Sequence, residues 1–137
     1  LCTADGETSL SHIQRQSVAL TADELVRLGI FRSEDVKGAN ALANIRRVFP
    51  HSIGHYLGMD VHDTGSVPRS EPLRPGIVIT LEPGLYVNNE TRDYPERFRG
   101  IGVRIEDDVL IGENGDIEVL SQDCPKSIAD IEELCQT

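Results

Sequence analysis

The sequence lacks the features that would place it in several classes of protein. Its three cysteines, Cys2, Cys124 and Cys135, are odd in number and share no metal-type spacing. They therefore form neither a disulfide framework nor a Cys-x-x-Cys redox motif, and we expect reduced thiols in a reducing compartment. No apolar run approaches about 18 residues, which excludes a transmembrane helix. The first residues have neither the apolar core of a signal peptide nor an Arg-rich presequence, and we expect them to come from the interior of a longer protein.

Clustered positive charge is also absent. The chain has 13 Lys and Arg residues against 23 Asp and Glu residues, a formal net charge of −10, with the acidic residues spread along its length. Nucleic-acid and anionic-membrane surfaces require clustered Lys and Arg, so we expect neither kind of partner. We interpret the acidic surface as a solubility feature. The length of 137 residues indicates one domain, or a piece of a larger one.

The hydrophobic pattern predicts a long helix near the N-terminus. Over residues 8–28, apolar side chains recur at roughly helical spacing. Ser9 or Ser11 can cap the start of this helix, and Gly29 lies just past its end.

Shorter elements follow this helix. Residues 30–47 predict a turn and a short helix, with Ser33 as a candidate N-cap, and residues 88–99 predict a surface loop. Pro125 is placed to open a C-terminal amphipathic helix. Helices followed by antiparallel-looking strands indicate an α+β fold. The predicted strands cover residues 77–82, 85–87, 102–111 and 117–120.

Three histidines, His51, His55 and His62, lie within twelve positions of one another. An isolated histidine is more often structural than functional. Here the histidines are separated by glycines, which let the backbone approach a site, and Pro50 argues against a long helix through them. The cluster as a whole therefore favours a functional site.

Two carboxylates complete the candidate site. Glu82 ends a predicted strand and, taken alone, indicates only a solvated residue. Strand alternation places Arg104 and Glu106 on one face, and two interpretations stay open there. They form either an exposed ion pair of little energetic value, or a buried carboxylate ligand oriented by an arginine. Together with His55, the two carboxylates form a ligand set typical of manganese, iron, cobalt or zinc.

Three ordered segments carry a resemblance to a known family: residues 50–63 (PHSIGHYLGMDVHD), 73–87 (LRPGIVITLEPGLYV) and 95–109 (PERFRGIGVRIEDDV). They resemble aminopeptidase P, a family of pita-bread metallopeptidases in the superfamily of prolidase and methionine aminopeptidase. Residues 95–100 are more similar to aminopeptidase P than to prolidase, and residues 62–70 are similar to its mitochondrial type. The resemblance covers nearly the whole chain. It implies a mitochondrial location, with the cytoplasm as the alternative.

The resemblance implies that His55, Glu82 and Glu106 are metal ligands, with Glu106 bridging two ions. The complete domain would hold two divalent cations, with manganese favoured and zinc, cobalt or iron as alternatives. A metal-bridged hydroxide would then remove the N-terminal residue from peptides that carry proline at the second position.

The resemblance also implies catalytic roles for His51, His62 and Arg104. The two histidines match residues that contact the substrate and steady the tetrahedral intermediate. Arg104 matches an arginine that orients the metal ligands without binding the metal itself. The implied partner is a peptide substrate with proline at the second position, and homo-oligomerisation is left open.

The chain departs from the family in one respect: two aspartate ligands from an earlier hairpin have no counterpart. We therefore expect residues 1–137 to be the C-terminal half of a pita-bread peptidase domain, with helices packed on a mostly antiparallel curved sheet. Without those ligands a binuclear centre should not assemble, and we expect the segment alone to be inactive. The alternatives are a non-catalytic pita-bread module that binds peptides or proteins, and a prolidase that acts on Xaa-Pro dipeptides.

Overall fold

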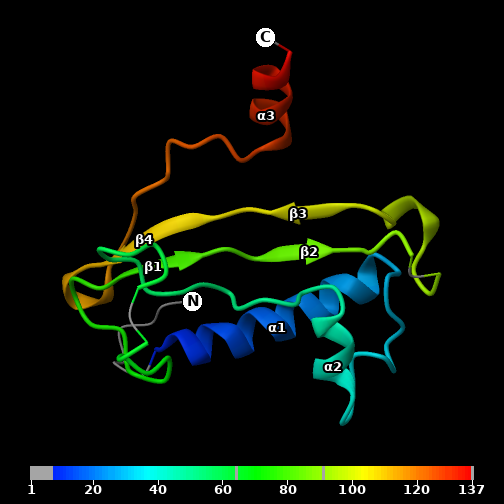
Figure 1. Cartoon of the computed structure of the whole chain (residues 1–137), viewed down its shortest axis with the longest axis horizontal. Coiled ribbons are helices and arrows are strands. Elements are labelled where there is room, and N and C mark those ends of the chain that lie inside the picture. Colours follow the sequence, from blue (N-terminus) through cyan, green and yellow to red (C-terminus); the bar gives the residue numbers. More distant parts are fainter. Residues whose placement is uncertain (1–7, 64, 91, 137) are drawn as a thin grey trace.

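The computed structural model describes residues 8–63, 65–90 and 92–136. Helices come first and antiparallel strands follow, which confirms the predicted α+β class (Figure 1). Along the chain the elements are α1 (Leu10–Arg27), α2 (Ala41–Arg46), β1 (Val78–Leu81), β2 (Gly84–Tyr86), β3 (Gly102–Arg104), β4 (Asp107–Ile111), β5 (Ile117–Val119) and α3 (Ile128–Cys135), with 3-10 turns at Glu96–Phe98 and Glu113–Gly115.

Helix α1 matches the predicted helix over residues 8–28. Ser9, and not Ser11, is the N-cap, because its hydroxyl accepts a hydrogen bond from the His12 N–H at 3.2 Å. Gly29 has a φ of +71°, a left-handed conformation that ends the helix and that other residues rarely adopt. The buried side chains of the helix are those of Leu10, Ile13, Ala22 and Leu25.

The turn before α2 differs from the prediction. Ser33 lies within the turn and is not an N-cap; the residue before the helix is Asn40, whose side chain makes no capping hydrogen bond. Asp35 organises the turn instead, because its carboxylate accepts the Arg32 N–H at 2.8 Å. The sequence pattern therefore located the helix but chose the wrong polar residue before it.

The strands form two antiparallel sheets, one in the order β1-β4-β5 and one of β2-β3, that continue each other as a long ribbon (Figure 1). Glu82 and Pro83 separate β1 from β2, and Ile105 and Glu106 separate β3 from β4. Pro83 has no N–H to donate to a ladder, although its carbonyl accepts the Ile105 N–H at 3.2 Å. The prediction of one continuous strand over residues 102–111 is therefore wrong, since the ribbon is interrupted at this point.

An extended segment, residues 53–57, lies along the free edge of β1. It is not helical, as the glycines and Pro50 predicted. Because this segment pairs with β1 as an irregular strand, it places the histidine loop beside the end of β1. The backbone bonds run from Leu57 N–H to Val78 O (3.0 Å), from Thr80 N–H to His55 O (2.9 Å) and from Glu82 N–H to Ile53 O (2.7 Å).

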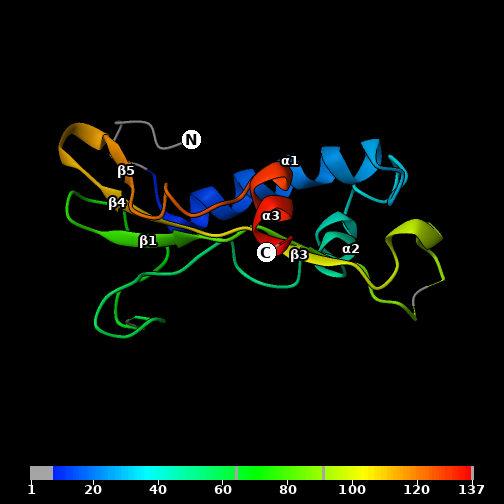
Figure 2. The same ribbon diagram turned by 90° about the horizontal axis from the view of Figure 1, so that it is seen from above.

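The hydrophobic core lies between α1, residues 45–56 and one face of the ribbon. Helix α1 runs lengthwise beside the ribbon in both views (Figures 1 and 2). Within the described ranges, no helix combines the length and the apolar character needed to cross a membrane. The most completely buried core side chains include Leu10, Leu25, Val48 and Ile79.

Helix α3 stands apart from the rest of the molecule (Figure 1). The predicted amphipathic helix is present and begins at Ile128, with the Ser127 hydroxyl accepting the Asp130 N–H at 3.1 Å. Its apolar side chains are exposed. Of the predicted thiols, Cys124 and Cys135 are free and exposed, and Cys2 lies outside the described residues. The exposed fractions are 79% for Ile128, 44% for Ile131 and 57% for Leu134.

Candidate metal centre

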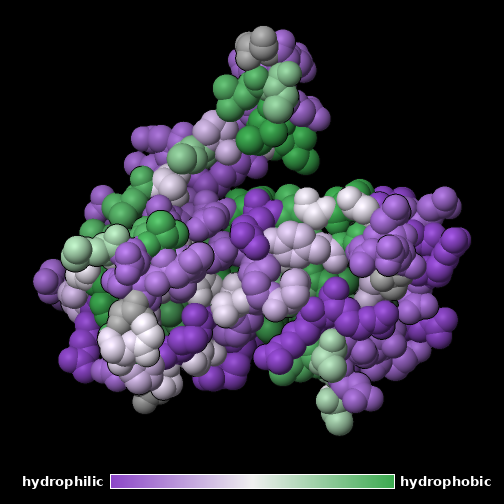
Figure 3. Space-filling model, in the orientation of Figure 1, coloured by the Kyte–Doolittle hydropathy of each residue, from purple (hydrophilic) through white to green (hydrophobic). Residues whose placement is uncertain are grey.

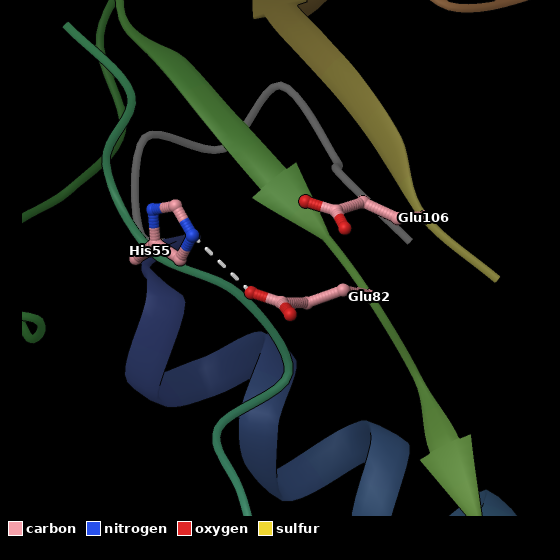
Figure 4. A group of neighbouring side chains, drawn as sticks. All are labelled: His55, Glu82 and Glu106. Atoms are coloured by element: carbon pink, nitrogen blue, oxygen red, sulfur yellow. Dashed lines mark ion pairs between the residues drawn. The ribbon is translucent and has the colours of Figure 1, made fainter. Parts of the chain in front are cut away.

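His55 is presented by the extended segment beside β1. Its backbone N–H donates to the Thr80 hydroxyl at 3.0 Å, and its ring Nδ1 lies 2.9 Å from the Tyr56 carbonyl oxygen. A carbonyl only accepts, so Nδ1 carries the proton and the neutral ring keeps a lone pair on Nε2. Nε2 faces the Glu82 carboxylate and lies 3.3 Å from Oε1 (Figure 4). The ring is thus held in the tautomer and orientation that a metal ligand needs.

Glu82 lies one residue beyond β1, where the chain turns at Pro83. Its side chain is only 12% exposed, and its Oε1 accepts a hydrogen bond from the Thr80 hydroxyl at 3.1 Å. Thr80 therefore bridges His55 and Glu82, and its own side chain is fully buried. The Arg104 guanidinium lies 3.7 Å from the other oxygen of Glu82.

Glu106 approaches the same point from the interruption between β3 and β4. One ligand atom from each of His55, Glu82 and Glu106 lies within 4.8 Å of the others, and all three side chains converge in Figure 4. Two neighbouring carboxylates repel each other unless a cation or a proton lies between them. One imidazole nitrogen with carboxylate oxygens fits a hard or borderline divalent cation, so the donor set suits such an ion.

The two interpretations of Arg104 and Glu106 both need correction. Arg104 forms its ion pair with Glu82 and not with Glu106. Glu106 is exposed, so it is not the buried carboxylate of the second interpretation. The interruption at Ile105 and Glu106 breaks the strand alternation on which both interpretations depended.

His51, Tyr86 and Arg104 form a hydrogen-bonded chain beside this group. Arg104 Nε donates to the Tyr86 hydroxyl oxygen at 2.8 Å, and that hydroxyl lies 3.1 Å from His51 Nε2. His51 Nδ1 is 2.7 Å from the Ser52 carbonyl, which only accepts, so the Tyr86 hydroxyl donates to Nε2. A Cβ at Gly84 would lie 2.6 Å from the Tyr86 oxygen, so this close packing requires a glycine.

His62 lies next to His55, with 4.5 Å between the ring centroids in an edge-to-face arrangement. It is exposed, unlike the partly buried His55. The structure thus gathers all six predicted residues at one end of β1 and around the ribbon interruption.

Thr80, Gly84 and Tyr86 are site residues that the sequence analysis missed. The signal was present, because Thr80, Glu82, Gly84 and Tyr86 are spaced by two, the period of side chains on one face of a strand. Extending that face across Pro83 would have identified both the hydroxyl that bridges His55 to Glu82 and the tyrosine between His51 and Arg104.

The family model of metallopeptidase family M24 matches residues 7–113. Xaa-Pro aminopeptidase 3 of Homo sapiens is 50% identical over 128 residues, which cover 93% of this chain and 25% of that protein. "Intermediate cleaving peptidase 55, mitochondrial" of Arabidopsis thaliana is 47% identical over 127 residues, covering 93% of this chain and 24% of that protein. The chain thus spans about a quarter of the length of these curated relatives.

Solved structures share the fold. Icp55 from Saccharomyces cerevisiae bound to the inhibitor apstatin matches with a TM-score of 0.82 at 42% identity, covering 99% of this chain and 31% of that one. Aminopeptidase P from E. coli with the inhibitor Pro-Leu matches with a TM-score of 0.79 at 40% identity, covering 94% of this chain and 29% of that one. The predicted pita-bread architecture and the resemblance to aminopeptidase P are confirmed. Because the family model matches most of its residues, the chain belongs to metallopeptidase family M24.

Proposed function

We propose that the protein containing this chain is a metal-dependent aminopeptidase that removes the N-terminal residue from peptides with proline at the second position. The observation that carries the proposal is the convergence of His55, Glu82 and Glu106 from three separate segments, with ligand atoms within 4.8 Å of one another. The proposal is supported by relatives named Xaa-Pro aminopeptidase and by related structures that bind apstatin or Pro-Leu.

The metal would be held by His55 Nε2 and by the carboxylates of Glu82 and Glu106. We propose manganese before zinc, cobalt or iron as the cation that these residues would hold. When bound, such a cation would supply Lewis-acid chemistry, polarising a carbonyl and activating water. Thr80 keeps the Glu82 carboxylate directed toward His55, and the Tyr56 carbonyl keeps the proton on Nδ1 of His55.

His51 and His62 would act on the peptide. His62 is exposed beside His55, and an imidazole N–H can donate a hydrogen bond to negative charge that develops on the substrate. The hydrogen-bonded chain from Arg104 through Tyr86 fixes the orientation of the His51 imidazole. We assign His51 and His62 to binding and orientation of the substrate, and Arg104 to support of the Glu82 carboxylate, which lies 3.7 Å from its guanidinium.

His55, Glu82 and Glu106 provide only part of the ligand set that two metal ions would need. Each metal ion in such a site needs several protein ligands, and affinity falls when they are missing. We therefore expect the 137-residue chain on its own to bind metal weakly and to be inactive. We also propose a mitochondrial location, supported by the relative that is named mitochondrial.

The test uses the longest natural form of the protein, purified metal-free and reconstituted with Mn²⁺. We expect it to release the first residue from an Xaa-Pro-Yaa tripeptide and to leave the matched Xaa-Ala-Yaa peptide intact. His55→Ala should abolish the activity. Turnover of Xaa-Pro dipeptides alone would indicate prolidase, and peptide binding without hydrolysis would indicate a non-catalytic module. Either result would contradict the proposal.

A further inference from the structure

The segment that follows β5 folds back over the start of β4. The Leu120 N–H donates to the Asp108 carbonyl at 2.8 Å, which extends the sheet by one pair. The Ser121 hydroxyl then donates to the Asp107 carboxylate at 2.6 Å and accepts the Asp108 N–H at 3.0 Å. Ser121 therefore binds both the side chain and the backbone at the first two residues of β4.

Lys126 closes this arrangement. Its ammonium lies 3.0 Å from the Asp107 carboxylate, and it also donates to the carbonyls of Ser121 at 2.7 Å and Cys124 at 3.0 Å. The three donors of the ammonium are thus satisfied by three acceptors in one place. The side chains of Lys126 and Asp107 are 25% and 31% exposed, so this ion pair is more protected than the typical surface pair.

The position of this anchor matters because Asp107 follows Glu106 directly. On its other side β4 pairs with β1, with Leu81 opposite Asp107 and Thr80 opposite Asp108. The start of β4 is therefore held from both edges, by β1 and by the segment after β5. Both Asp107 and Asp108 lie in β4 and are partly buried.

Glu106 has little other support. Its side chain is exposed, and the backbone before it is held by the bond between Ile105 N–H and Pro83 O. The direction of its carboxylate therefore depends on how firmly the backbone is held at residues 105–108. Metal sites require ligand placement to within about 0.5 Å, which an exposed side chain achieves only on a rigid backbone.

We propose that Lys126 and Ser121 are positioning residues for Glu106: by anchoring Asp107 and Asp108 they hold the Glu106 carboxylate where it can join His55 and Glu82 on a metal ion. The inference rests on the proposed function, because it assumes that these three residues bind metal. Lys126 and Ser121 act through the Asp107 side chain and the backbone of β4, and neither belongs to the ligand group.

The experiment is a Co²⁺ titration of the longest natural form, purified metal-free, followed by calorimetry and by visible absorption. Lys126→Met removes the charge and keeps the length of the side chain, and Lys37→Met is the matched control because Lys37 is the chain's other lysine and is exposed. We expect Lys126→Met to weaken Co²⁺ binding about tenfold, within the range for residues that orient metal ligands, and to shift the cobalt absorption band. Lys126→Arg should retain most of the affinity, and Lys37→Met should bind like the wild type.

Thermal unfolding of the metal-free variants separates positioning from stability. If Lys126→Met fails to fold, Ser121→Ala is used, and we expect it to weaken binding about threefold, an effect at the weak end of those seen for such residues. Wild-type affinity and spectrum in the folded variants would overturn the inference, provided that His55→Ala still abolishes Co²⁺ binding. Failure of both variants to fold would also overturn it, because the anchor would then be structural. Unchanged Co²⁺ binding by His55→Ala would instead refute the metal centre itself.

Discussion

The hydroxyls of Tyr86 and Tyr94 differ in their hydrogen bonding. That of Tyr86 accepts from Arg104 and donates to His51, so it is fully used in the site. That of Tyr94 is buried without a hydrogen-bond partner among the described residues, although its ring packs edge-on against Phe31 with centroids 5.6 Å apart. A buried hydroxyl without a partner costs free energy, because it has lost its water. Tyr94 therefore contributes through its ring and not through its oxygen.

Replacing Tyr94 with phenylalanine should raise the free energy of unfolding by about 1 kcal/mol, because the unpaired oxygen is removed and the ring is kept. Tyr56 is the matched control, since its hydroxyl donates to the Pro68 carbonyl at 3.2 Å. Tyr56→Phe should lower the free energy of unfolding by a similar amount. Urea unfolding of the longest natural form measures both. Equal destabilisation by the two substitutions would show that Tyr94 has a partner.

The Tyr94 variant should also change the response to alkaline pH. Burial is the main cause that raises the pKa of Tyr94 above its ordinary value of 10.0, so the folded protein holds the phenolic proton more tightly than the unfolded chain. A raised pKa gives stability that is complete below the unfolded pKa and is lost as the pH rises through the folded one. When the pH rises from 9 to 11, the melting temperature of the Tyr94→Phe variant should therefore fall less than that of the wild type.

At the scale of elements, the interruption of the ribbon creates the site. The long hairpin pairs regularly on both sides, and it opens where Pro83 meets Ile105. Both carboxylates lie in this gap, because a residue outside the ladder can turn its side chain toward a neighbour instead of alternating. The extended segment at residues 53–57 then brings His55 to the same place.

Features that depend on local spacing were predictable from the sequence, whereas features that depend on pairing between distant residues were not. The helix at residues 8–28, the strand ending near Glu82 and the group of candidate residues followed from local spacing and turn residues. The break within residues 102–111 could not be predicted locally, because it depends on which residue faces Pro83 across the hairpin. The anchoring of Asp107 was missed for the same reason, since its partners Ser121 and Lys126 are 14 or more positions away in the sequence.

In the extended segment that carries His55, Gly54 is a position where a larger side chain cannot fit. A Cβ there would lie 1.8 Å from the Thr80 carbonyl oxygen, a backbone atom that cannot move without displacing β1. Gly54→Ala should therefore separate residues 53–57 from β1, lower the free energy of unfolding by about 1–3 kcal/mol and weaken Co²⁺ binding. Gly65→Ala is the control, because a Cβ at Gly65 meets no atom within 4 Å. Wild-type affinity in a folded Gly54→Ala variant would show that the pairing with β1 does not position His55.

At the scale of the whole molecule, hydrophobic surface is concentrated between α3 and the ribbon. Figure 3 shows hydrophobic side chains on the side of α3 that faces the body and along the edge of the body opposite. A cavity of about 580 Å³ separates the two and is lined by apolar residues together with four charged ones, Arg104, Glu106, Lys126 and Glu132. Glu106 therefore borders a space whose walls combine apolar side chains with charges of both signs. The apolar side chains lining it are those of Val103, Ile105, Pro125, Ile128 and Ile131.

This surface predicts how the 137-residue chain behaves when it is produced alone. Val103 and Ile105 are 52% and 47% exposed, and Ile128 is 79% exposed, so the described residues leave a contiguous apolar face open to solvent. Such faces bind other hydrophobic surfaces and hydrophobic dyes. The isolated chain should therefore enhance the fluorescence of the dye ANS and self-associate in light scattering. The substitutions Val103→Thr and Ile131→Gln together should reduce both signals, whereas Leu42→Gln on α2, which is 47% exposed but lies away from this face, should not.

The longest natural form should bind little ANS if its additional residues cover the face, because the same side chains would then be buried. Strong ANS binding by both forms would show instead that the face remains open and belongs to a surface that meets another molecule.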